Sequence, residues 1–317
     1  MDRKRLLTRI KTFSLIMLAL LTAGEIGLRF GLGLGNPVLM KSGKTYRYIC
    51  APNQNLHRFG NHVFINRWSM RSNHIDRDRH NPDELRVMVI GDSVVFGTTL
   101  VDQSEIATSA MIPMLSDRLR RPVKTMNVSA GSWNIPDQVA YIDEFGHFDA
   151  DVVLWVLNSG DLQPNDFSTA IVGVHPQFPD RKPLTAIGEL AGRYLLPRLK
   201  LRSMPENPAP VFGQAEIEQV LAEFSSSLAR MNEAGVRVII VLYPTKNQLD
   251  GIPTSFAKPI REAAERTDVE IIDLTARIRG AVHDGAGFYY DSIHATREGQ
   301  YMIARWFTEL IVERLGA

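Results

Sequence analysis

Two short segments that lie far apart in the chain carry residue types able to perform nucleophilic catalysis. Gly91-Asp92-Ser93 follows a short apolar run, and Asp291-Ser-Ile-His294 stands directly before the last helical pattern. A serine hydroxyl is a poor nucleophile until a base takes its proton. An aspartate three residues before a histidine can bind the imidazole Nδ1, which leaves Nε2 free to face the serine. The pattern predicts Ser93 as nucleophile, His294 as base and Asp291 as the residue that orients the base.

Each segment taken alone has an ordinary structural interpretation. Gly-Asp-Ser is also typical of a turn with a capping serine, and Asp-x-x-His is as common in surface turns as in active sites. The two together, one after the first strand of the main domain and one before the last helix, favour a catalytic site. In an open α/β sheet such groups gather beyond the carboxyl ends of the strands, where Ser93 is expected.

The elements that must position these residues follow from the spacing of apolar side chains. Apolar runs predict strands, and helical periodicity predicts helices between them. The predicted strands are 87–90, 123–128, 152–157, 236–243 and 269–274, and the predicted helices are 104–119, 136–145, 214–233 and 296–315. Strands that alternate with helices over short connections predict a flavodoxin-like, three-layer α/β/α fold around a central parallel five-stranded sheet.

Two segments interrupt this alternation. Residues 36–85 are polar and irregular, and they are expected to form a lead-in segment with a few short strands. Residues 160–213 are rich in proline and are interpreted as an insertion on the substrate side, with one short helix around 184–199. The main domain is therefore predicted to span 86–317.

The N-terminus carries an export signal. Five basic residues lie within 1–11, and an uncharged run from 12 to 24 comes directly after them. A basic flank before an apolar run keeps the N-terminus in the cytoplasm and directs the rest of the chain to the other side of the membrane. Residues 1–35 are interpreted as a cytoplasmic basic tip and a transmembrane helix, with Glu25 and Arg29 paired at its outer end. A cleaved signal peptide is the alternative, because the uninterrupted run is short and Ala23-Gly24 is small.

The sequence resembles the GDSL or SGNH hydrolase family over about residues 86–315. Gly91-Asp92-Ser93 with Gly97 matches the family's first block, and Asn127-Val-Ser-Ala-Gly131 matches the second. Asp291-Ser-Ile-His294, followed by Thr296 and Gly299, matches the last. The resemblance implies that the backbone N–H groups of Ser93 and Gly131 bind the oxyanion. The leading segment also resembles a membrane-anchored bacterial subgroup of this family, in Glu25 and Arg29 within the apolar stretch and in Pro52-Asn53-Gln54 and Ile65-Asn66 after it.

One block departs from the family pattern. The family usually has Gly-x-Asn-Asp after the third strand, where the asparagine binds the oxyanion, but this chain has Asn158-Ser-Gly160-Asp161. Asn158 is close enough in sequence to take the missing role, and it could equally be an asparagine that ends a strand. Loss of one oxyanion donor costs about 3–4 kcal/mol of transition-state stabilisation.

Three further residues are candidates for substrate binding. Trp133 and Asn134 follow Gly131, and Lys246 follows the fourth strand on the expected active face. Core packing is an equally good explanation of Trp133, and an ordinary loop position is a better explanation of Lys246.

Composition excludes several function classes. A net charge of +1 gives no reason to expect a nucleic-acid partner, and Cys50 is the only cysteine, so no disulfide framework is possible. No metal-ligand spacing or phosphate loop appears, and no cofactor is expected. The oligomeric state is not indicated.

The resemblance and the export signal together imply a function. We expect a serine-dependent esterase or acyltransferase that acts on O-acyl groups, most simply acetyl, of a cell-envelope or exopolysaccharide glycan. Its catalytic domain would lie on the periplasmic or extracellular side of the inner membrane. The alternative, motivated by the altered third block, is a non-catalytic carbohydrate-binding or assembly protein that keeps the fold.

Overall fold

A central parallel sheet organises the computed structural model, which describes residues 3–165, 171–199, 212–251 and 256–316. Its strand order is β6 (Val123–Ser129), β5 (Leu85–Gly91), β7 (Val152–Leu157), β8 (Arg237–Leu242) and β9 (Glu270–Asp273). All four neighbouring pairs are parallel. In chain order this is 2-1-3-4-5, the flavodoxin-like arrangement that the sequence predicts.

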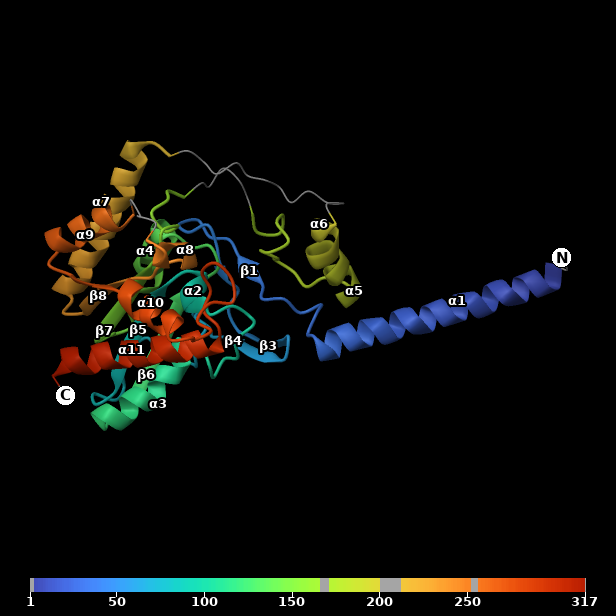
Figure 1. Ribbon diagram of the computed structural model, residues 1–317, viewed down its shortest axis with the longest axis horizontal. Coiled ribbons are helices and arrows are strands. Elements are labelled where there is room, and N and C mark those ends of the chain that lie inside the picture. Colours follow the sequence, from blue (N-terminus) through green and yellow to red (C-terminus); the bar gives the residue numbers. More distant parts are fainter. Residues whose placement is uncertain (1–2, 166–170, 200–211, 252–255, 317) are drawn as a thin grey trace.

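Helices cover both faces of the sheet (Figure 1), which explains why β5 and β7 are buried throughout and, apart from Arg86 in β5, apolar. One face packs against α3 (Ala107–Leu119), α10 (Thr275–His283) and α11 (Arg297–Leu315). The other packs against α4 (Ile135–Phe145), α7 (Gln214–Glu233) and α9 (Ala257–Arg266). The three-layer prediction is confirmed, although the sequence pattern did not reveal α9 and α10.

The segment predicted as a lead-in is built into the main core. It forms two antiparallel pairs, β1 (Met40–Lys41) with β2 (Ile49–Cys50) and β3 (Gln54–Arg58) with β4 (Asn61–Ile65). Its buried Tyr48, Leu56 and Val63 belong to the same apolar cluster as the α4 and α7 side of the sheet. Because this segment is part of the core, it can bring side chains to the edge of the sheet where the parallel strands have their carboxyl ends.

The described part of the proline-rich insertion holds a short helical unit. It consists of α5 (Ala186–Glu189), a π-helical turn η2 (Leu190–Leu195) and α6 (Leu196–Arg198). The predicted short helix at 184–199 lies there, whereas 166–170 and 200–211 are outside the described residues.

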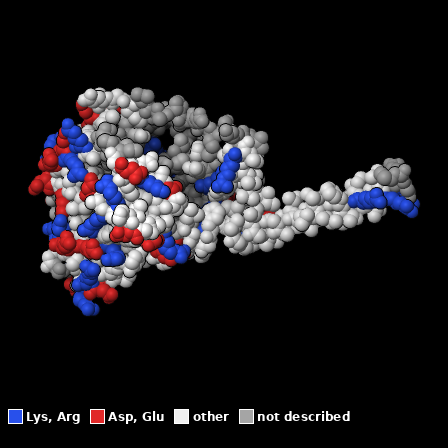
Figure 2. Space-filling view, viewed as in Figure 1, with Lys and Arg blue, Asp and Glu red and all other residues white. Residues whose placement is uncertain are grey.

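The N-terminal helix projects from the body of the molecule (Figure 1). It comprises α1 (Arg3–Ile26) and the π-helical turn η1 (Gly27–Gly31). Lys4–Gly31 is long and apolar enough to cross a membrane, a test that a signal sequence also passes. Figure 2 shows basic side chains at its tip and an almost uncharged surface along most of its length.

Two charged residues near the C-terminal end of this helix join it to the insertion. Arg29 Nη2 lies 2.6 Å from Glu25 Oε1, as the predicted pair requires. The Glu25 carboxylate also accepts the N–H groups of Ala186 and Ile187, at 2.8 and 3.0 Å. Glu25 therefore satisfies backbone donors that begin α5.

Candidate active site

Ser93 lies at the carboxyl end of β5, where the strand order reverses and α/β proteins place their ligands. It is the first residue of α2 (Ser93–Phe96), and Asp92 caps this turn by accepting the Val94 N–H at 2.8 Å. Gly97 ends the turn at φ 78°, and a Cβ there would approach Ile106 Cγ2 to 2.7 Å. The glycine therefore lets the turn bend sharply enough to present the serine hydroxyl.

His294 comes to this edge from the loop that precedes α11. Its Nε2 lies 2.8 Å from Ser93 Oγ, and its Nδ1 lies 2.7 Å from Asp291 Oδ2. The Tyr290 ring stacks on the imidazole, with centroids 5.6 Å apart and planes 16° apart. The structure thus brings together all three residues that the sequence singled out, in one hydrogen-bonded chain.

Asp291 is held in its ionised form. Its partial burial alone would raise its pKa, but the N–H groups of His294 and Ile293 and the His294 ring together keep the pKa below its usual range. The backbone groups donate to Oδ1 at 2.7 and 2.9 Å, which leaves Oδ2 for the imidazole. An anion in this place can fix the histidine tautomer and stabilise the imidazolium.

A cleft of about 350 Å³ opens beside the serine, and its described lining includes Ser93, His294 and Gly131. Tyr48 donates to the Gly131 carbonyl at 2.6 Å and so fixes this peptide. Within the described part of the chain, the N–H groups of Ser93 and Gly131 meet no hydrogen-bond acceptor. Both amides are therefore available to a bound oxygen.

The side-chain amide of Asn158 is taken up by contacts within the protein. Its Nδ2 donates to Asp92 Oδ2 at 3.0 Å, and its Oδ1 accepts the Gly160 N–H at 2.9 Å. It is buried and is not part of the described cleft lining. The contact seen in the structure joins the β7 loop to the serine turn.

Two buried carboxyl groups lie behind the serine. Burial raises the pKa of Asp92, which hydrogen bonds from Val94 and Asn158 only partly offset. Burial, together with nearby Asp92, raises the pKa of Asp161 well above its ordinary value. Asp161 Oδ2 accepts the Asn158 N–H at 2.7 Å, so this carboxyl shapes the loop after β7.

The three residues suggested for substrate binding lie outside the described cleft lining. Trp133 is buried and donates to the Tyr48 carbonyl at 2.7 Å. Asn134 caps α4, where its side chain accepts the Asp137 N–H at 3.4 Å. Lys246 is exposed at the start of α8 (Lys246–Leu249). In each case scaffold contacts or solvent take up the side chain, and the binding role of these residues stays a prediction.

The sequence pattern missed several cleft residues that come from the lead-in and the insertion. They include Arg58, Gln177, Phe178, Arg193 and Tyr194. No local motif marks them, because the folding of remote segments against the sheet edge places them there.

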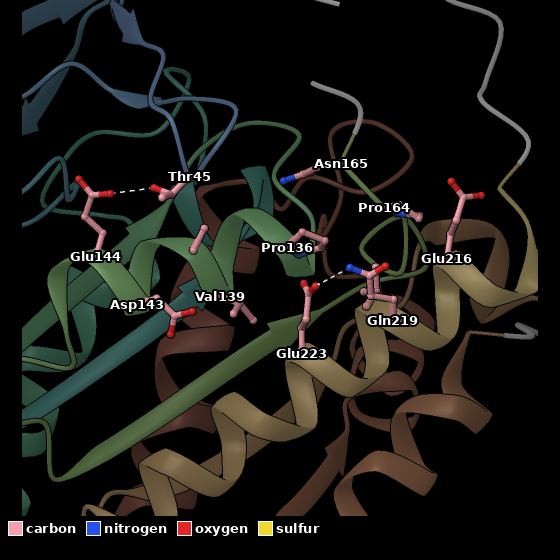
Figure 3. Close-up of a pocket in the computed structure, with 12 residues that line it drawn as sticks. Thr45, Pro136, Val139, Asp143, Glu144, Pro164, Asn165, Glu216, Gln219 and Glu223 are labelled. Carbon is pink, nitrogen blue, oxygen red and sulfur yellow. Dashed lines mark hydrogen bonds between the residues drawn. The ribbon is translucent and has the colours of Figure 1, made fainter. Parts of the chain in front are cut away.

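A larger groove of about 690 Å³ lies elsewhere, and Figure 3 shows it between α4 and α7. Its described lining is acidic, with Asp143, Glu144, Glu216 and Glu223, and contains none of the residues around Ser93. Among the residues that the structure describes, no group of three or more His, Cys, Asp or Glu could hold a metal ion.

Comparison with known proteins gives similarity in structure alone. No protein-family model matches the chain. No curated protein matches it either. The psychrotrophic esterase EstA from Pseudoalteromonas sp. is 13% identical with a TM-score of 0.44, over 73% of this chain and 99% of that chain.

Two further solved structures are similar to the same degree. The acetyl xylan esterase AlAXEase is 12% identical, with a TM-score of 0.45, over 72% of this chain and all (100%) of that chain. A member of the lipolytic G-D-S-L family from Veillonella parvula is 12% identical with a TM-score of 0.42, over 72% and 97%. Similarity at this level carries no conclusion about activity, which has to come from the geometry of the site.

Proposed function

We propose that this chain is a serine-dependent ester hydrolase or acyltransferase of the GDSL type. The supporting observation is the unbroken chain of contacts from Asp291 Oδ2 through the His294 ring to Ser93 Oγ, at 2.7 and 2.8 Å. These distances are within the range over which a base takes a proton from a nucleophile.

The proposed reaction uses each of these groups in turn. His294 Nε2 takes the Ser93 proton while Oγ attacks the acyl carbon, and the developing oxyanion binds the N–H groups of Ser93 and Gly131. The imidazolium then gives its proton to the leaving alcohol. Water or a sugar hydroxyl, activated by the same imidazole, removes the acyl group from Ser93.

The proposed substrate is a small acyl ester, most simply acetyl, on a glycan. The cleft offers hydroxyl and amide groups from Thr98, Ser132 and Gln177 beside the aromatic rings of Phe178 and Tyr290. Sugars suit this combination because they present hydroxyls along their edges and C–H groups on their faces.

The proposed location is the outer face of the inner membrane, with α1 as an uncleaved anchor. The basic tip and the apolar length support this assignment. The contacts of Glu25 with α5 join the C-terminal end of this helix to the domain.

One observation favours a second candidate, a carbohydrate-binding or assembly protein without catalysis. The Nδ2 of Asn158 donates to Asp92, so the site relies on two backbone donors where the family has an additional side chain. A missing oxyanion donor lowers turnover by roughly 10²- to 10³-fold, which a binding protein would tolerate.

Hydrolysis of p-nitrophenyl acetate by the full chain in detergent separates the two candidates. We expect turnover that falls by roughly 10⁴-fold or more in Ser93→Ala and His294→Ala, because the two residues act as a unit. Ser226→Ala on α7, an exposed serine, is the matched control and should be unchanged. A folded wild type without turnover would support the binding protein instead.

A further inference from the structure

The charged side chains that line the cleft beside Ser93 are positive. Its described lining contains two guanidinium groups, from Arg58 and Arg193, and no carboxylate. Arg58 comes from β3 and Arg193 from η2, so the lead-in and the insertion each contribute one.

The charge of Arg58 is already matched. Its Nη2 lies 2.6 Å from Glu189 Oε1, and both side chains are almost fully buried, with 2% and 5% exposed. Tyr194 Oη lies 2.9 Å from the same Nη2. The other Glu189 oxygen accepts the Gly35 N–H at 2.5 Å. The Glu189 carboxylate therefore already binds the Arg58 guanidinium and one backbone N–H group.

Arg193 has no acid of its own in the described structure. Its closest carboxylate is the same Glu189, with Nη1 3.6 Å from Oε1, longer than a hydrogen bond. Only 24% of its side chain is exposed. Burial, with Arg58 acting in the same direction, lowers the pKa of the Arg193 guanidinium. Two cations share one anion here, and a partly buried positive charge is left over.

A buried charge is costly unless it is paired. We propose that Arg193 binds a singly charged anionic group on the substrate, either a sugar carboxylate or a phosphodiester, next to the ester that Ser93 attacks. The planar guanidinium suits both groups, because it can donate two parallel hydrogen bonds to a pair of oxygens. That Ser93 attacks an ester beside this group rests on the proposed function, whereas the binding of an anion by Arg193 does not.

The surroundings of Arg193 fit an extended anionic glycan. Arg193 also lines a second cleft, of about 560 Å³, whose described lining includes Arg181 and Lys182 as well as Asp180 and the Arg58-paired Glu189. The two clefts meet at Arg193, so a polymer that reaches Ser93 could continue along this basic surface. Binding along such a surface weakens with salt.

The test uses the full-length Ser93→Ala variant in detergent, which removes hydrolysis from the measurement. Calorimetry at low salt would compare tetragalacturonate, its neutral methyl ester and dimethyl phosphate. We expect one of the two anions to bind in an Arg193-dependent way. For tetragalacturonate the preference over its methyl ester should be about tenfold or more, as hydrogen bonds to charged groups allow.

Second-site variants separate charge from folding. Arg193→Gln should abolish the anion preference, Arg193→Lys should keep part of it, and Arg118→Gln, an exposed residue on α3, should keep all of it. If tetragalacturonate binds in an Arg193-dependent way, the anionic group of the substrate is a carboxylate. If only dimethyl phosphate does so, the group is a phosphodiester.

The proposal would be overturned if neither anion depended on Arg193 in variants that melt like the parent. This test measures binding and not turnover. If the wild type had no esterase activity but the Ser93→Ala variant still preferred the anion through Arg193, only the proposed catalysis would be contradicted.

Discussion

Nε2 of His294 lies 2.8 Å from Oγ of Ser93 although 201 positions separate the two residues in the chain. The first strand of the sheet delivers the serine and the loop before the last helix delivers the histidine. The proposed chemistry therefore depends on contacts between remote segments, and each of these contacts can be tested by substitution.

The orientation of the base depends on Asp291. Asp291→Asn keeps the shape of the side chain but cannot hold the imidazole in the tautomer that accepts the serine proton. We expect kcat for p-nitrophenyl acetate to fall roughly 10³- to 10⁴-fold. Asp284→Asn, which changes an exposed aspartate on another loop, is the control. Equal activity of both variants would show that Asp291 has no part in the reaction.

The raised pKa of Asp161 gives stability a pH dependence of a particular sign. Between the unfolded pKa of about 3.9 and the higher folded value, the folded state holds more protons, so stability falls as pH rises. Asp161→Asn keeps the oxygen that accepts the Asn158 N–H and removes this part of the slope. Urea unfolding from pH 4 to 8 would measure the dependence of the unfolding free energy on pH in both proteins. The same dependence in wild type and variant would show that Asp161 does not hold its proton in the folded state.

The buried pair of Arg58 and Glu189 fastens the insertion to the lead-in. Glu189→Gln leaves a buried guanidinium without its anion, which we expect to cost about 3–5 kcal/mol of unfolding free energy. The exposed pair of Arg230 and Asp143 is the matched comparison, since Asp143→Asn should cost less than about 1 kcal/mol. Similar losses in urea titrations of the two variants would mean that the buried pair is not special.

Glu25 connects the N-terminal helix to α5 through the N–H groups of Ala186 and Ile187. Glu25→Ala removes the acceptor of both, so their amide hydrogens should exchange with solvent faster. Hydrogen exchange followed by mass spectrometry of the full chain in detergent would detect this change. Thr22→Ala, one turn earlier on α1, should leave the two amides protected, and protection in both variants would mean that Glu25 does not hold α5.

Much of this molecule could be predicted from local pattern. The apolar runs of β5 and β7 reflect burial on both faces of the sheet, which leaves a clear signal in sequence. Ser93 and His294 could be found because catalysis requires particular residue types next to a strand end and a helix start. Helices α9 and α10 are shorter and more polar on average than the other helices that cover the sheet, and the strand and helix pattern missed them.

The residues that surround Ser93, His294 and Asp291 were harder to predict, because their positions depend on tertiary contacts. Asn158 follows β7 as expected, but its amide partner, Asp92, belongs to another strand end. Trp133 follows Gly131 in sequence and turns into the core, since its indole N–H reaches the Tyr48 carbonyl. Arg193 reaches the cleft only because Glu189 and Arg58 hold the insertion against β3.

Activation of the Ser93 hydroxyl by His294 is the central claim, and it can be measured directly. Intact-mass spectrometry after treatment of the full chain with a fluorophosphonate should show one adduct, mapped to Ser93, in the wild type. We expect no adduct in Ser93→Ala and much slower labelling in His294→Ala. A folded wild type that remains unlabelled, or a His294→Ala variant that labels at the wild-type rate, would contradict the claim.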